Sequence, residues 1–246
     1  MVVTVAVVVV VVLLVLLVSG VLNLGGSSGS GVGTPVPYSQ AVPVAIREGQ
    51  NATGGPWTVV VAEGLGIPSS VSQVSPASAT GNGCTFTNPP GASGVVSIDG
   101  TASSAAPGTV ATWVFFAKNV SANVILLISV SNGQASPISL VTGCTFVSEF
   151  SNVDPISATG VVDSPAIASS FNSAGGAGFL KNNSGATEFF LLYGADPAES
   201  SSSFWGVEYD TCALTATSGT GSLFEGSFDA TSGATIGPPT LSPTDC

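Results

Sequence analysis

Two pairs of carboxylates have a spacing that suits acid–base chemistry: Glu208 with Asp210, and Asp196 with Glu199. Glycoside hydrolysis uses two such carboxyl groups, one on each side of the bond that breaks. On a strand, Glu208 and Asp210 would point to the same side, about 7 Å apart. The same oxygens suit a hard cation such as Ca²⁺. They suit a solvent-facing strand equally well, and we favour that interpretation because no other reactive residue accompanies either pair.

The rest of the sequence offers little for catalysis. It contains no histidine, so a nucleophilic triad lacks its usual base and a zinc site lacks a usual ligand. No glycine motif for binding phosphates or dinucleotides occurs. We therefore expect a protein that is not an enzyme, with no catalytic, cofactor-binding or metal-binding residues.

The charge balance excludes nucleic acids as partners. The chain has 3 Lys+Arg against 14 Asp+Glu, and a net charge of −11. Nucleic-acid binding needs clustered Lys and Arg, whereas Arg47, Lys118 and Lys181 stand far apart in the sequence. A surface with so few titratable groups changes little as the pH falls, so the composition suits an acidic exterior.

Four cysteines occur, and none belongs to a CxxC pair. An even number behind an apolar N-terminal segment predicts two disulfides in an oxidising compartment. Three pairings are possible, and adjacency in the sequence favours Cys84–Cys144 and Cys212–Cys246. Four buried free thiols are the alternative.

Three N-x-[ST] sequons predict glycosylation at Asn51, Asn119 and Asn182. Each is expected in a turn that precedes a strand. Glycans at these positions would shield a surface that has few charges. Alternatively, Asn and Ser simply form the turns, because Asn tolerates the left-handed backbone conformation.

The N-terminus carries the strongest signal for location. Residues 2–18 are a run of Val and Leu interrupted by Thr4 and Ala6, and no charge occurs before Arg47. A helix over this run is roughly 26 Å long, and a helix extended to Leu24 is about 35 Å long, which brackets the hydrocarbon core of a bilayer. We expect a transmembrane anchor over residues 1–24. A cleaved signal peptide is the alternative, with possible cut sites after Ser19-Gly20 or Gly25-Gly26, although the basic leader is missing.

A spacer and one β domain are expected after the anchor. Residues 25–44 begin with GGSSGSGVG and contain three prolines, which predicts a flexible and then extended stalk. Residues 45–246 lack long stretches of helical periodicity. Short β-branched and aromatic runs alternate there with Gly, Pro, Asn and Ser, at residues 57–62, 94–98, 109–117, 123–131, 144–150, 188–193, 204–209 and 212–217.

This pattern predicts an all-β ectodomain, an antiparallel sandwich that is immunoglobulin-like in the loose sense. GCTF at residues 83–86 recurs at 143–146, and the KNxS segment at 118–121 recurs at 181–184. Two or three repeated β units are therefore expected, near residues 45–98, 99–160 and 161–246. Biased composition is the alternative explanation of these matches. Trp57, Trp113 and Trp205 are expected in the core rather than exposed to bind sugars.

Residues 113–133, WVFFAKNVSANVILLISVSNG, resemble the strand–turn–strand hairpins of archaeal surface β domains, including archaellins and archaeal type IV pilins. The resemblance implies a hydrophobic N-terminal helix that precedes a β-sandwich. A pilin also implies a basic-Gly leader and a longer helix, and the sequence has neither.

Together these features predict a non-enzymatic β protein at the cell surface. It would be held in the membrane as a single-pass protein through residues 2–24, with its C-terminal domain outside the cell. Its role would be adhesion, ligand binding or envelope structure, with a surface protein or a carbohydrate as partner. A pilin-like filament subunit is the alternative, and a secreted carbohydrate-active enzyme is a remote one.

Overall fold

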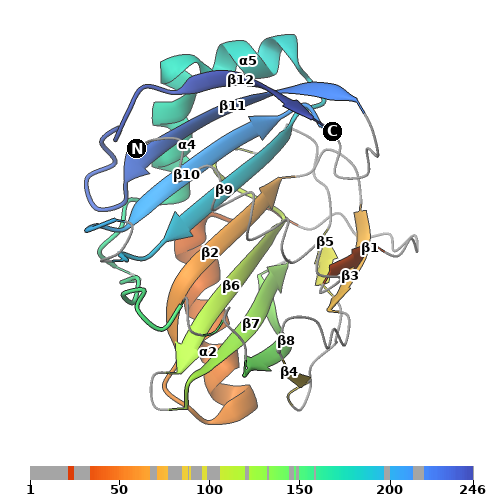
Figure 1. Ribbon diagram of the computed structural model, residues 1–246, viewed down its shortest axis with the longest axis vertical. Coiled ribbons are helices and arrows are strands. Elements are labelled where there is room, and N and C mark those ends of the chain that lie inside the picture. Colours follow the sequence, from red (N-terminus) through yellow and green to blue (C-terminus); the bar gives the residue numbers. More distant parts are fainter. Residues whose placement is uncertain are drawn as a thin grey trace.

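A computed structural model of the chain is built mainly from antiparallel β-sheet, which confirms the predominantly β prediction (Figure 1). The structure describes residues 22–24, 34–66, 71–76, 85–87, 89, 96–98, 106–119, 122–131, 133–143, 147, 150–157, 159–196, 200–212 and 219–245.

The larger sheet has nine strands in the order β12-β11-β10-β9-β2-β6-β7-β8-β4. Its strands are β2 (Thr58–Gly66), β4 (Thr85–Thr87), β6 (Thr112–Asn119), β7 (Val124–Ser131), β8 (Gln134–Thr142), β9 (Thr187–Tyr193), β10 (Phe204–Asp210), β11 (Thr220–Asp229) and β12 (Thr240–Asp245). A second sheet has the order β1-β3-β5 and consists of β1 (Leu22–Leu24), β3 (Val71–Pro76) and β5 (Val96–Ile98).

Helices that were not predicted from the sequence cover one face of the large sheet (Figure 1). They are α2 (Tyr38–Thr53), α4 (Ser164–Phe171) and α5 (Ala177–Asn182), and a five-residue π-helical turn (Asn172–Gly176) joins the last two. The buried residues of α2 recur with helical spacing, at Tyr38, Ala41, Val42, Ala45 and Gly49. The sequence did not predict this layer of helices, although it did predict the antiparallel strands that the helices cover.

The two sides of the large sheet have different neighbours. The side against the helices, the helix face, carries a single core cluster that includes Trp113, Phe115, Trp205, Val207 and Tyr209. Side chains alternate between the faces along a strand. The opposite side, the far face, therefore carries Glu63, Phe116, Lys118, Glu208 and Glu225.

The sheet consists of two halves with the same order of elements. In the N-terminal half α2 precedes β2, β6, β7 and β8, with β3, β4 and β5 inserted between β2 and β6, and in the C-terminal half α4 and α5 precede β9, β10, β11 and β12. Each half is an antiparallel meander, and the two first strands, β2 and β9, pair at the centre. The register pairs Glu63 with Leu191, which lie where a two-fold axis between the halves would pass.

A tryptophan in the second strand of each half makes the same contact. The Trp113 Nε1–H donates to the carbonyl of Val36, and the Trp205 Nε1–H donates to the carbonyl of Val162, both at 2.9 Å. Each carbonyl belongs to the residue two positions before the helix of its own half. The two indole rings meet edge-to-face with centroids 6.3 Å apart. These matching contacts support a duplicated helix-plus-four-strand unit.

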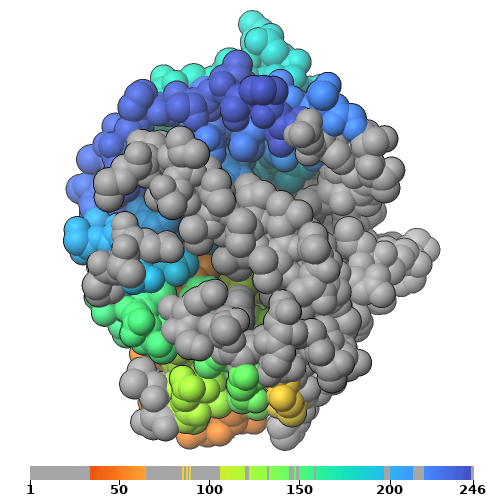
Figure 2. All heavy atoms as spheres, in the orientation of Figure 1, coloured from red at the N-terminus to blue at the C-terminus, as the bar shows by residue number. Residues whose placement is uncertain are grey.

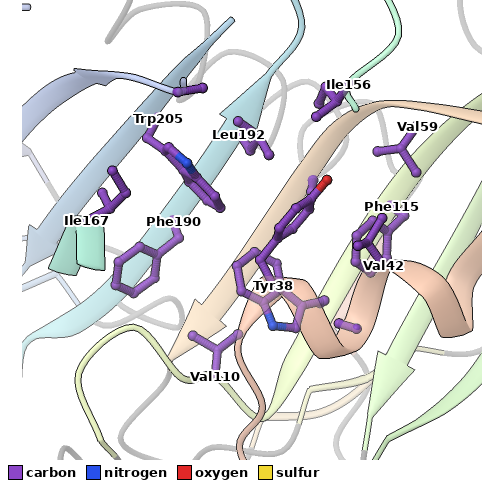
Figure 3. Close-up of a cluster of buried hydrophobic side chains, with 14 of the residues drawn as sticks. Tyr38, Val42, Val59, Val110, Phe115, Ile156, Ile167, Phe190, Leu192 and Trp205 are labelled. Atoms are coloured by element: carbon purple, nitrogen blue, oxygen red, sulfur yellow. The ribbon is translucent and has the colours of Figure 1, made fainter. Parts of the chain in front are cut away.

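Glycine and tyrosine complete the packing between the halves. A Cβ atom on Gly64 would lie 2.8 Å from Trp113 Cζ3, so only glycine leaves room for this indole ring. Tyr38, the first residue of α2, contacts both Trp113 and Trp205 at centroid distances of 5.8 and 5.5 Å. Figure 3 shows its ring between Trp205 and Phe115. All three tryptophans are buried, as predicted.

Asp163 joins the N-termini of the two long helical segments. Its Oδ1 accepts hydrogen bonds from the backbone N–H of Ser164, in α4, and of Ser39, in α2, both at 2.9 Å. Its Oδ2 accepts a bond from the Ser39 hydroxyl at 2.6 Å. The residue before α2 is Pro37, which has no side-chain cap to offer. One carboxylate therefore caps two helices and faces the positive ends of both macrodipoles.

Three boundaries expected from the sequence need correction. Leu22–Leu24 are strand β1, paired with β3, so the predicted helix does not extend through these residues; residues 1–21 lie outside the described residues. Residues 38–44 belong to α2, because their apolar side chains pack on the sheet, and are not part of an extended stalk. The repeat observed has two units, α2 to β8 and α4 to β12, rather than the expected ranges 45–98, 99–160 and 161–246.

None of the helices among the described residues has both the length and the apolar character needed to span a membrane.

Candidate functional site

Three carboxyl groups gather on the far face of the C-terminal half. Trp205, Val207 and Tyr209 of β10 point into the core, so Glu208 and Asp210 point together to the far face, as the sequence indicated. The register of β11 adds Glu225 directly opposite Glu208. Figure 2 shows the C-terminal strands, in blue, at the surface along the upper rim of the molecule.

Glu208 and Glu225 occupy the closest kind of cross-strand position. The Thr211 N–H donates to the carbonyl of Ser222 at 3.1 Å, and the register then runs without a shift along β10 and β11. Hydrogen-bonded and non-hydrogen-bonded pairs alternate along such a ladder, which makes Glu208–Glu225 a non-hydrogen-bonded pair. The Cα atoms of such pairs lie about 4.5 Å apart.

Burial dominates the electrostatics of this cluster. Burial, together with the neighbouring charges of Glu225 and Asp210, raises the pKa of Glu208 to about 8. Burial also raises the pKa of Asp210, against a hydrogen bond from the backbone N–H of Cys212 at 2.8 Å. The Thr240 hydroxyl donates to Glu225 Oε1 at 3.1 Å. Glu208 is therefore the carboxyl group that holds a proton at neutral pH.

Glu63 is a second buried carboxyl group on the far face. It is 2 % exposed, and burial raises its pKa to about 8. Its Oε1 has no hydrogen-bond partner in the described part of the chain. Leu191 and Val114 flank it on the neighbouring strands. Such surroundings keep this side chain neutral, because an ionised carboxylate without a partner is costly to bury.

A small pocket of about 100 Å³ lies between the end of β6 and the start of β7. Lys118 forms part of its wall, and its ammonium donates to the carbonyls of Ser151, at 3.3 Å, and Val153. Burial lowers the pKa of Lys118, partly offset by the charge of Asp154. The two carbonyl contacts show that Lys118 fastens the 150–153 segment to β6.

Of the second carboxylate pair of the sequence, the structure describes Asp196 alone. Asp196 is buried, and its carbonyl accepts a hydrogen bond from the Ser200 N–H at 2.7 Å. Glu199 lies outside the described residues. Within the described residues, no group of three His, Cys, Asp or Glu side chains is placed to hold a metal ion.

Cys212, the one cysteine among the described residues, is disulfide-bonded. Cys84, Cys144 and Cys246 lie outside the described residues, so the pairing remains a prediction.

The three sequons lie at the ends of elements rather than in free turns. Asn51 is exposed in the last turn of α2, and Asn182 is exposed at the end of α5. Asn119 ends β6 and is half-buried, and its Oδ1 accepts a hydrogen bond from the Ala122 N–H at 3.2 Å. Asn51 and Asn182 are therefore the more accessible of the three.

Sequence reasoning found Glu208 and Asp210 but missed Glu225 and Glu63. Glu225 stands in the segment SLFEGSF, where no local feature indicates a partner. Only the register of β10 against β11 brings it to Glu208. Glu63 interrupts the apolar run of β2, and this single charged residue was the sequence feature that could have indicated a buried carboxyl group.

No protein-family model, curated protein or solved structure matches this chain.

Proposed function

We propose that the protein is a non-enzymatic, membrane-tethered surface protein whose β-rich body displays the C-terminal half to a ligand. The observation that carries this proposal is the uncharged Val and Leu run at residues 2–18, followed by a Gly/Ser-rich segment before the folded body. Such a run inserts readily in a bilayer, because each Val or Leu contributes about −0.3 to −0.6 kcal/mol.

The proposed orientation places the C-terminal body outside the cell. The disulfide at Cys212 supports an oxidising compartment. In addition, Thr85 of β4 pairs with Thr142 of β8, and Cys84 and Cys144 lie one and two residues beyond this pair along the chain. We therefore keep Cys84–Cys144 as a proposed disulfide, with Cys212–Cys246 as the second.

The surface proposed for a protein or carbohydrate ligand is the far face of β10, β11 and β12. Most residues of β11 are partly exposed, in contrast to the buried strands β6 and β7. Hydroxyl and carboxyl groups lie together on this face, and such groups form the hydrogen bonds that recognise sugars and peptides. Glycans at Asn51, Asn119 and Asn182 are proposed as further surface modifications.

Membrane extraction of the full-length chain tests the tether. We expect the protein to stay with membranes in alkaline carbonate and to be released by detergent. A matched variant with Val9→Asp and Val10→Asp in the apolar run should move to the soluble fraction. Wild-type protein that is soluble without detergent would contradict the tether, and filaments seen by electron microscopy would favour the pilin-like alternative.

Mass spectrometry of the protein purified from membranes tests the compartment. We expect the Val and Leu run in the mature chain, two disulfides, and glycans first at Asn51 and Asn182. A mature N-terminus beyond residue 20 would show cleavage and contradict the anchor. Four free thiols would contradict the oxidising compartment.

A further inference from the structure

We propose that Glu208 and Glu225 share a proton, and that this proton controls how firmly the β11–β12 hairpin is attached to the sheet. This inference goes beyond the proposed surface role and does not depend on it, because it concerns the stability of one edge of the fold.

The first support is the geometry of the pair. Glu208 and Glu225 face each other in a non-hydrogen-bonded pair of the β10–β11 ladder, where side chains come closest. Asp210, two residues further along β10, points to the same side. Like charges directly opposite each other destabilise a sheet, so two ionised glutamates would push β10 and β11 apart.

The second support is the absence of a compensating cation in the described surroundings. β9 places the ring residue Phe189 opposite Glu208, while Glu188 of that strand points to the helix face. On β11, Glu225 is flanked on the same face by Leu223 and Ser227. Among the described side chains of β12, the Thr240 hydroxyl reaches Glu225. The three basic residues of the chain are elsewhere, on α2 (Arg47), at the end of β6 (Lys118) and on α5 (Lys181).

A single proton on the pair removes the repulsion between the Glu208 and Glu225 carboxylates. With Glu208 neutral, Glu225 remains as the carboxylate that accepts the Thr240 hydroxyl bond. Two carboxyl groups that cannot both ionise commonly share one proton in this way. The raised pKa of Glu208, about 8, agrees with the geometry. Above that pH the proton passes to hydroxide or buffer, and two carboxylates then face each other.

The outer strands are the part of the fold that would move. In the described structure β12 is held to the sheet by β11 alone. The other face of β11 carries Phe224, whose ring stacks on Phe179 of α5 with centroids 5.7 Å apart and lies 5.0 Å from Phe171 of α4. Deprotonation of Glu208 should therefore loosen β11, β12 and their contact with α5, while β2, β6 and β7 remain intact.

Hydrogen exchange of the full-length protein in detergent, at pH 6, 7.5 and 9 and corrected for the intrinsic rate, tests this inference. We expect the protection of residues 220–245 to fall at least tenfold between pH 6 and 9, relative to residues 124–142. In Glu208→Gln and in Glu225→Gln one carboxylate is absent, so protection should persist at pH 9. Glu48→Gln, on α2, is the matched control and should behave as wild type.

A pH-dependent loss in Glu208→Gln and Glu225→Gln equal to that of wild type would overturn the proposal. So would a loss that spreads over the whole sheet and disappears in Glu63→Gln, which would assign the effect to Glu63. If the variants do not fold, ¹³C NMR of the glutamate carboxyl groups in wild type decides. A titration of Glu208 near pH 8 that moves the amide resonances of β11 supports the shared proton, and ordinary titration of Glu208 between pH 4 and 5 contradicts it.

Discussion

The N-terminal half of the sheet, with α2, and the C-terminal half, with α4 and α5, share one order of elements but differ on the far face. In the N-terminal half this face is mainly apolar apart from Glu63 and Lys118, and Phe116, Ile125 and Leu127 are each at most 3 % exposed. In the C-terminal half Glu208 and Glu225 occupy the positions of Phe116 and Leu127, and both are partly exposed.

The helix faces, by contrast, match closely. Trp113 and Trp205 donate to equivalent carbonyls at the same distance, and both rings are fully buried. Packing constrains a core strongly, because protein interiors are as dense as organic crystals. The comparison teaches that the two halves share the contacts of the helix face, while the far face is mainly apolar in one half and acidic in the other.

Replacing each tryptophan by alanine should give the largest effect. Trp113→Ala and Trp205→Ala should each lower the free energy of unfolding by about 3–5 kcal/mol, because a large buried ring leaves a cavity. Urea denaturation measures the loss. Trp→Phe at each site keeps an aromatic ring but loses the indole hydrogen bond, and should cost less. If one tryptophan tolerates alanine, the two halves are not equivalent.

Substitution of Glu63, which pairs with Leu191 at the two-fold axis between the halves, should give the next effect. Glu63 has a raised pKa in the folded state, so its neutral form contributes to stability below the ordinary pKa of a glutamate. This contribution is lost as the pH rises through about 8. Glu63→Gln should therefore leave stability nearly unchanged at pH 4.5 and raise it by up to about 5 kcal/mol at pH 9, since the pKa rises from 4.5 to about 8 and one pKa unit corresponds to about 1.4 kcal/mol.

Glu63→Leu, which makes the two residues on the axis identical, should give the same trend in urea midpoints at pH 4.5 and 9. Wild-type stability that does not fall between these pH values would contradict the burial of a neutral Glu63.

Asp163 links the halves through their helices, and its removal should cost somewhat less. Asp163→Ala removes two caps at once, and one cap is typically worth about 1 kcal/mol, so we expect a loss of about 2 kcal/mol in thermal or urea unfolding. Ser39→Ala removes only the hydroxyl bond on the α2 side and should lose less than half of this. Equal losses would mean that Asp163 caps a single helix.

The smallest effect on stability concerns the outer edges. β8 is covered by β4, whereas β12 ends the sheet. Ser242 pairs with Leu223 and directs its backbone N–H toward β11. The backbone nitrogen of the next residue, Pro243, therefore faces the unpaired edge of β12, and it carries no N–H. Proline at such a position blocks the addition of another strand.

Pro243→Thr should change the free energy of unfolding by less than about 0.5 kcal/mol but produce oligomers in light scattering. Leu241→Thr, which removes the most exposed apolar side chain of β12, is the control and should stay in the wild-type state. A Pro243→Thr protein that also stays in that state would show that this edge is protected by something other than Pro243.

The sequence predicted those elements whose signal is local. The β-branched and aromatic runs of β6, β7, β9 and β10 indicated strands, and the tryptophans were assigned to the core correctly. β11 and β12 were missed because Gly, Ser and Pro interrupt their apolar residues. α2 was missed because it contains Val, Gly and Pro43, and because its cap is Asp163, which no local pattern connects to residue 38.

The cap between Ser39 and Asp163 also affects the order in which the chain can fold. The two residues are 124 positions apart in the chain, so a chain that emerges from its N-terminus exposes α2 long before the cap is synthesised. Contacts of such separation close slowly, because loop entropy is lost before they form. The cap on α2 is therefore completed only when the second half of the chain is present.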